Sequence, residues 1–331
     1  MHPDNRFWDE WKGSRVQLLY ARNEEELPEL SGETFVVQTK LSEPKARRLS
    51  SRNALLGFAH LPMHERKPEW LLACTLVATV SEYCISLLRK AGVERLHGEP
   101  IYGIAEVARG DASEAVLRSS PYLWDRRKVR DRLFSVFYRP TAEKFEKRKG
   151  VTLGILSLIV PIKQFPLLFS RIAPVLARHD DVHVEIFGAG GYAQVRDLRK
   201  ALRPIAARTR FWGYQRNVAA VCGKIDYLLT GLPEKEALGL NVLEAEVCGT
   251  PVLAPRGGPF GETIIDGRTG FLYRDPREDA GADFERVLLK AKAGPRPDPR
   301  TQTAHLERFG YPALVERAKR LLAALERAAP R

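Results

Sequence analysis

The alternation of short apolar runs with segments of helical periodicity constrains the fold of this chain most strongly. It is clearest in the second half, where apolar runs lie at 151–160, 182–190, 209–214, 225–231 and 250–258. Amphipathic stretches such as 165–179 separate these runs. Apolar strands that alternate with helices are typical of a parallel sheet covered on both faces. The second half is therefore predicted to be an α/β, doubly wound domain.

The first half repeats this alternation with less regularity. Apolar runs at 15–21, 34–40, 54–60 and 75–81 predict strands, and the run at 98–104 predicts one more. The segment 105–150 is polar and basic, and it is interpreted as the connection between two domains. We therefore expect an N-terminal domain over 1–147 and a C-terminal domain over 148–310. An amphipathic C-terminal helix over 311–331 could pack back on the N-terminal domain.

The chain is long enough for two domains, and its charge is unevenly placed. It has 331 residues, 44% of them hydrophobic, and a formal net charge of +12. Basic residues are concentrated between positions 126 and 149; they are Arg126, Arg127, Lys128, Arg130, Arg132, Arg139, Lys144, Lys147, Arg148 and Lys149. They form either a patch for an anionic partner, such as a membrane surface, or a solvated helix face or linker.

The cysteines and the apolar runs bear on the compartment. Cys74, Cys84, Cys222 and Cys248 form no C-x-x-C pair, which favours free thiols in a reducing compartment. The N-terminal segment shows no signal peptide, and no apolar run is long enough to span a bilayer. We expect a cytoplasmic protein, with peripheral membrane contact through 126–149 left open.

The segment 236–252 carries the main candidate site. Glu236 should lie in a loop before a helix, facing the crevice at the carboxyl ends of the strands. Gly239 would allow close backbone approach, so the amides of 238–240 could point at a ligand from the helix start. Glu244, one to two turns into the helix, could accept hydrogen bonds from a diol such as a ribose. The alternative is that both glutamates are ordinary surface helix residues.

A wider pattern surrounds this segment. The runs are E-A-L-G-L-N-V-L-E-A (236–245), C-G-T-P-V (248–252) and G-G-P-F-G-E-T-I-I-D-G-R-T-G-F-L (257–272). In this order they resemble the C-terminal signature of the GT-B retaining glycosyltransferases of family 4, also called group 1. The resemblance extends over 151–275 and more thinly over 60–105. It implies a GT-B fold, in which two Rossmann-like domains face each other across a cleft, here with an abbreviated N-terminal domain.

The resemblance also implies roles for single residues. Glu236 would bind hydroxyls of the transferred sugar, Lys163 the donor diphosphate and Glu244 the nucleotide ribose. The further donor-binding positions are Leu238, Gly239, Leu240, Gly188, Gly190, Gly213, Tyr214 and Arg256. His60 resembles the family's histidine near the transferred sugar, with His64 as the fallback; alternatively, His60 only ends a strand.

One position departs from the family pattern. Leu158 stands where the family usually has an arginine for the diphosphate, and Arg256 or Arg216 could supply the missing cation. The activity implied is metal-independent, retaining transfer from a nucleotide-diphosphate sugar, with no cofactor and no metal site, since the chain has no Asp-x-Asp motif. The acceptor is open: a saccharide, a lipid-linked molecule or an anionic molecule.

Two alternatives remain. The chain could be a degenerate, non-catalytic nucleotide-sugar binder or partner subunit, which Leu158 motivates. A nucleic-acid-binding or nucleic-acid-modifying protein, prompted by the net charge, lacks any helix-turn-helix, RNA-recognition or zinc signature, so no specific nucleic-acid partner is expected.

Overall fold

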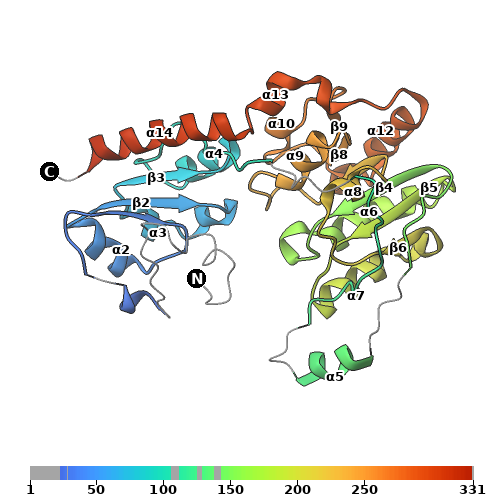
Figure 1. Ribbon diagram of the computed structural model, residues 1–331, viewed down its shortest axis with the longest axis horizontal. Helices are drawn as coiled ribbons and strands as arrows, with labels where there is room; N and C mark the ends of the chain where they lie inside the picture. The colour runs from blue at the N-terminus through green and yellow to red at the C-terminus, as the bar shows by residue number, and fades with distance from the viewer. Residues whose placement is uncertain (1–22, 28, 106–111, 125–128, 138–142, 330–331) are drawn as a thin grey trace.

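The computed structural model describes residues 23–27, 29–105, 112–124, 129–137 and 143–329. Figure 1 shows two lobes, each built on a parallel sheet. The C-terminal sheet contains β4 (Val151–Leu156), β5 (Val182–Phe187), β6 (Thr209–Phe211), β7 (Tyr227–Leu229), β8 (Val252–Pro255) and β9 (Gly270–Tyr273). Its order is β6-β5-β4-β7-β8-β9, so the winding direction reverses between β4 and β7. In doubly wound sheets, ligands bind beyond the carboxyl ends of the strands at this switch point.

Strand residues of the C-terminal sheet alternate between two cores. Leu153, Leu229 and Leu253 belong to one core, whereas Leu228 and Val252 belong to the other. Side chains of adjacent strand residues point to opposite sides, so both faces of the sheet are apolar, and helices cover both of them. The helices of this lobe are α6 (Phe165–Leu176), α7 (Tyr192–Ala201), α8 (Val218–Cys222), α9 (Leu240–Val247), α10 (Phe260–Thr263), α11 (Pro276–Asp279), α12 (Ala282–Ala293) and α13 (Thr303–Glu307). The short 3-10 helices are η3 (Pro161–Lys163), η4 (Arg203–Arg208) and η5 (Pro299–Thr301).

The N-terminal lobe is smaller. Among the described residues it has three parallel strands in the order β1 (Thr34–Val37), β2 (Ala54–Ala59) and β3 (Leu76–Thr79). Its helices are α2 (Glu43–Ser50), α3 (Glu69–Leu72) and α4 (Glu82–Lys90), with η1 (Glu24–Glu26) and η2 (Pro62–Arg66). The Ser42 and Ser81 side chains cap α2 and α4 by accepting backbone N–H bonds.

Two strand predictions for this lobe match no observed strand. The run at 15–21 lies outside the described residues. The strand predicted at 98–104 is wrong, because this segment crosses from one lobe toward the other as irregular chain. Ile101 and Tyr102 are buried, and the Ile101 amide donates a hydrogen bond to the Thr79 carbonyl. Tertiary packing therefore accounts for the apolar pattern.

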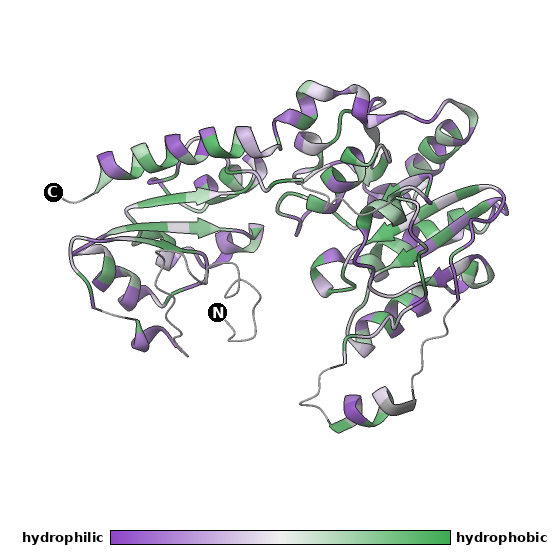
Figure 2. Cartoon of the chain, in the orientation of Figure 1, coloured by the Kyte–Doolittle hydropathy of each residue, from purple (hydrophilic) through white to green (hydrophobic). Residues whose placement is uncertain are grey.

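The last helix, α14 (Tyr311–Ala328), runs from the C-terminal lobe over the N-terminal sheet (Figure 1). Leu321 and Leu325 are buried in one core with Ala54, Leu56 and Leu76. Figure 2 shows hydrophobic and hydrophilic residues alternating along this helix, as an amphipathic helix requires. Its polar side is tied to the lobe by Arg320, whose Nε lies 2.8 Å from Glu99 Oε2. The chain thus crosses between the lobes a second time.

The basic segment contains the helix α5 (Val129–Phe137). Arg126, Arg127, Lys128 and Arg139 lie outside the described residues. Two later members are used within the fold: Lys147 Nζ lies 2.6 Å from Asp226 Oδ1, and Arg148 pairs with the buried Glu185 at 3.0 Å. In the part of the chain that the structure describes, no helix is long and apolar enough to cross a bilayer.

Candidate active site

A cavity of about 820 Å³ lies between the two lobes at the switch point of the C-terminal sheet. The loop after β4, the loop after β7 and the start of α9 line it from the C-terminal lobe. The ends of β2 and β3, the crossing segment near Ile101 and Leu314 of α14 line it from the other side. Such a position between domains is where two-domain α/β proteins hold small ligands.

Lys163 and Glu236 face each other in this cavity. Lys163 is on η3 after β4, Glu236 is in the loop after β7, and the lysine Nζ donates a hydrogen bond to Glu236 Oε2. The two side chains are only 22% and 14% exposed. Gln164, the next residue, has a left-handed backbone with φ of 52°, an uncommon conformation outside glycine that starts α6. The turn that presents Lys163 is therefore tightly determined by the start of α6.

Gly231 brings the two loops together. A Cβ atom at this position would lie 2.0 Å from the backbone oxygen of Lys163. Only a residue without a side chain allows the chain leaving β7 to pass so near the η3 turn. The glycine was not singled out from the sequence, since a buried strand followed by Thr-Gly carries no signal of its partner.

The start of α9 offers unpaired backbone donors to the same cavity. Gly239 is the N-cap with φ of 84°, and Leu238, Gly239 and Leu240 all line the cavity. Among the described residues, their amides have no hydrogen-bond acceptor. The open amides and the positive end of the helix dipole favour an anionic or hydroxyl-rich ligand.

Glu244 lies in α9, one turn beyond these amides, and also lines the cavity. Burial raises the pKa of this carboxyl, and the nearby Lys163 opposes the rise. His60 lines the opposite wall, and its ring centroid is 4.6 Å from that of Phe58. Burial lowers the pKa of His60, so the imidazole is neutral at pH 7 and can accept as well as donate a hydrogen bond.

A smaller hollow of about 150 Å³ adjoins the main cavity. Gly188, Tyr214 and Arg216 line it, and it shares the residues 156–158 with the main cavity. Leu158 therefore stands between the two spaces, with 46% of its surface exposed. Of the two arginines that could replace the family's cation, Arg216 lies at this hollow.

Other predicted positions lie away from both spaces. Gly190 and Gly213 pack against backbone: added Cβ atoms would lie 2.2 Å from Ile159 O and 2.5 Å from Ser119 O. Arg256 lines neither space; it is 62% exposed and pairs with Asp266 at 3.0 Å. His64 is also absent from the cavity wall and stacks edge-on with Trp70, with ring centroids 6.0 Å apart.

A glutamate of the C-terminal lobe caps a helix of the other lobe. Glu262 Oε2 and Oε1 accept the amides of Glu82 and Tyr83, each at 2.8 Å, at the start of α4. The Tyr102 hydroxyl donates to the same carboxylate at 3.2 Å, and the Tyr83 hydroxyl donates to the Glu234 carbonyl at 3.0 Å. Burial raises the pKa of Glu262, while the two amides act against that rise. These contacts fix the relative position of the cavity walls.

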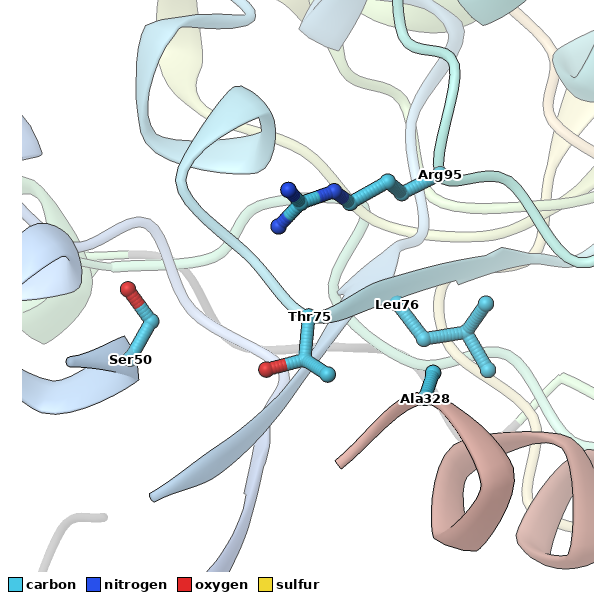
Figure 3. Close-up of a pocket in the computed structure, with 5 residues that line it drawn as sticks. All are labelled: Ser50, Thr75, Leu76, Arg95 and Ala328. Carbon is cyan, nitrogen blue, oxygen red and sulfur yellow. The ribbon is translucent and has the colours of Figure 1, made fainter. Parts of the chain in front are cut away.

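A second hollow on the N-terminal lobe is a weaker candidate (Figure 3). It measures about 520 Å³ and has one charged side chain, Arg95, in its wall. The Thr75 hydroxyl at its edge already accepts a hydrogen bond from the Leu55 amide at 3.0 Å.

No cluster of three or more histidine, cysteine, aspartate or glutamate side chains able to hold a metal ion occurs among the described residues.

The C-terminal lobe resembles known enzymes in sequence. Residues 149–289 match the family described as glycosyl transferases group 1. The N-acetyl-alpha-D-glucosaminyl L-malate synthase of Bacillus anthracis is 44% identical over 160 residues, covering 47% of this chain and 42% of that protein. The D-inositol 3-phosphate glycosyltransferase of Arthrobacter sp. strain FB24 is 38% identical over 76 residues, or 23% and 18% of the two chains. The chain thus covers less than half of these relatives.

Solved structures resemble the whole fold. HepE of Anabaena, in complex with UDP and glucose, has a TM-score of 0.59 at 18% identity, covering 88% of this chain and 77% of that one. The sucrose-phosphate synthase of Thermosynechococcus elongatus has a TM-score of 0.62 at 15% identity, covering 89% and 74%. These neighbours confirm the predicted GT-B fold.

Proposed function

Because residues 149–289 make the C-terminal domain of this chain a member of the group 1 glycosyltransferases, we propose that the protein transfers a sugar from a nucleotide-diphosphate sugar to an acceptor in the cleft. The proposal includes retention of the anomeric configuration and independence of a metal ion. The observation that carries it is the meeting of Lys163, Glu236 and the α9 amides at the sheet's switch point.

The two adjoining spaces support one placement of the donor. The nucleotide would lie toward the smaller hollow, beside Tyr214 and Arg216, with its ribose near Glu244. The diphosphate would lie over the α9 amides and Lys163, and the sugar hydroxyls would meet Glu236. Two neighbouring structures of HepE hold UDP or UDP-glucose, so uridine donors are the first to test.

The chemistry needs stabilisation of a leaving diphosphate. In the proposed front-side reaction, the acceptor oxygen bonds to the anomeric carbon while the bond from that carbon to the phosphate oxygen breaks. The electron pair stays on the diphosphate, whose oxygen takes the acceptor's proton. Fixed donors that gain strength as this charge develops lower the barrier more than they stabilise the bound donor. Lys163 and the α9 amides are such donors.

The test combines a donor screen with one matched pair of variants. Calorimetry with UDP, GDP and ADP identifies the base, and donor hydrolysis is then measured with the corresponding sugars. Glu236→Ala should lower hydrolysis about 100-fold or more, whereas Glu278→Ala, an exposed glutamate on α11, should leave it unchanged. Equal hydrolysis rates in the native protein and Glu236→Ala would rule out the role given to Glu236.

Leu158 favours a second candidate, a nucleotide-sugar binder without turnover. A leucine at the diphosphate cannot stabilise the leaving group, although binding through the amides and Lys163 would persist. Nucleotide binding in calorimetry, with no hydrolysis or transfer for any donor, would decide for this second function.

A further inference from the structure

Three large apolar side chains are exposed toward the interlobe cavity. Leu61, Leu158 and Leu240 are 39%, 46% and 44% exposed, and all three line it. They come from the loop after β2, the loop after β4 and the first turn of α9. A single exposed leucine is normal, but several that converge on one hollow mark a binding surface for an apolar group.

The N-terminal wall of the cavity is apolar as well. Phe58, Val80, Ile101 and Leu314 line it, and each is at least partly buried. The polar side chains of this wall are His60 and Tyr102, and the Tyr102 hydroxyl already donates to Glu262. This wall therefore offers His60 as its one side-chain hydrogen-bonding group for a ligand, among the residues described.

Among the described residues, the charged groups that line the cavity lie on the opposite side. Lys163, Lys235, Glu236 and Glu244 all belong to the C-terminal lobe. A sugar buried against the N-terminal wall would leave most of its hydroxyls without partners, which costs free energy for each one. An alkyl or aryl group would instead gain free energy from the area it removes from water.

Leu240 extends this wall across the gap between the lobes. A Cβ atom added to Gly103 would lie 2.8 Å from Leu240 Cδ2, so the α9 leucine lies directly against the crossing segment of the N-terminal lobe. Leu240 is also adjacent to the amides proposed to hold the diphosphate. The apolar surface thus reaches the edge of the proposed reaction site.

We propose that the acceptor carries an apolar aglycone, alkyl or aryl, which lies on the wall formed by Phe58, Leu61, Val80, Ile101, Leu240 and Leu314. The acceptor hydroxyl then points toward the C-terminal lobe, with His60 as its neighbour. The assignment of this ligand as an acceptor rests on the proposed transfer function; the preference of the cavity for an apolar group does not.

The test compares three glucosides that share one sugar. Octyl, phenyl and methyl β-D-glucopyranoside are titrated into the full-length protein by calorimetry, below the micelle concentration of the octyl compound. We expect the octyl or the phenyl glucoside to bind at least about tenfold more tightly than the methyl glucoside. The ratio of the affinities for the octyl and the phenyl glucoside distinguishes a preference for an alkyl aglycone from a preference for an aryl aglycone.

Two leucine variants control for non-specific adsorption. Leu61→Ser should lower the affinity for the favoured glucoside about threefold or more, while Leu72→Ser should not change it. Leu72, on α3 of the same lobe, is 46% exposed and lies outside the cavity wall. Equal affinity for all three glucosides, no binding of any, or equal loss in both variants would overturn the apolar preference.

Nucleotide titrations keep this result apart from the proposed function. UDP, GDP and ADP are titrated into the native protein and both leucine variants, which should bind the nucleotide alike. If an apolar glucoside binds but no nucleotide does, the transfer function fails while the apolar preference stands. If a nucleotide binds and the glucosides do not discriminate, the apolar preference fails alone.

Discussion

Substituting Gly231 by alanine tests whether the position of Lys163 controls the reaction. The added Cβ would lie 2.0 Å from the Lys163 backbone oxygen, and such atoms essentially never approach closer than 3.0 Å. The two loops must therefore separate by at least the difference, 3.0 − 2.0 = 1.0 Å. Misplacement of a catalytic group by about 1 Å can cost about 100-fold in rate.

The displaced loop has little freedom to absorb the change. Gln164 is held in the left-handed region, and Phe165 directly after it is 1% exposed in the main core. Movement of Lys163 therefore either disturbs the start of α6 or opens the distance to Glu236. We expect Gly231→Ala to lower kcat/KM for the donor about 100-fold and to cost about 1–3 kcal/mol of stability through overpacking.

Gly261 provides the matched control. It lies in α10 of the same lobe, and a Cβ atom there would meet nothing within 4 Å. Gly261→Ala should keep native kcat/KM and stability, since alanine favours a helix. Both variants are assayed at a temperature below the melting transition of each, recorded by circular dichroism. If folded Gly231→Ala turns over donor like Gly261→Ala, the reasoning about the lysine turn is refuted.

Two further predictions concern the nucleotide and the pH dependence of stability. Arg216→Ala should weaken nucleotide binding in calorimetry about tenfold. Arg268 is exposed and lines neither cavity, so Arg268→Ala should not weaken it. An equal effect of the two substitutions contradicts the role of Arg216. Glu246 in α9 is 0% exposed, and burial raises the pKa of its carboxyl, although His305, whose Nε2 lies 3.4 Å away, opposes the rise. The folded form therefore retains this proton to higher pH than the unfolded chain. The stability contributed by Glu246 is thus lost as the pH rises from about 4.5 toward the raised pKa of the folded state. Over that range, the free energy of unfolding of Glu246→Gln in denaturant titrations should rise relative to that of the native protein by about 1.4 kcal/mol per pH unit. Parallel curves of unfolding free energy against pH for the two proteins contradict this prediction.

The C-terminal lobe was predictable because the strands β4, β5, β7 and β8 are buried on both faces. The predicted runs 151–160, 182–190, 209–214, 225–231 and 250–258 each contain an observed strand, since mostly apolar runs bounded by turns have few other uses in a doubly wound domain. The edge strand β9 and the helix α12 were missed. β9 has only four residues, and its sequence was interpreted solely as part of the family motif.

The limits of prediction in the site lie in contacts between distant segments. Glu262 is a fixed position of the family motif, yet only the structure shows that it caps α4, some 180 residues earlier in the chain. Gly190 and Gly213 follow strands, as donor-binding glycines would, but their partners are Ile159 and Ser119. A glycine near a strand end has the same sequence signal whether a ligand or another backbone approaches it.

Leu158 makes the Lys163–Glu236 pair the central electrostatic feature of the cleft. Without the family's arginine, the cations lining the main cavity in the described part of the chain are Lys163 and Lys235, and Lys163 is already neutralised by Glu236. A donor diphosphate would draw Lys163 toward its own charge, which leaves the Glu236 carboxylate to accept hydrogen bonds from the sugar hydroxyls. The exchange keeps both side chains paired before and after binding, so neither charge is buried alone at any stage. Donor binding would then depend on both ends of the ligand at once: UDP alone, lacking hydroxyls for Glu236, should bind less tightly than the intact sugar nucleotide.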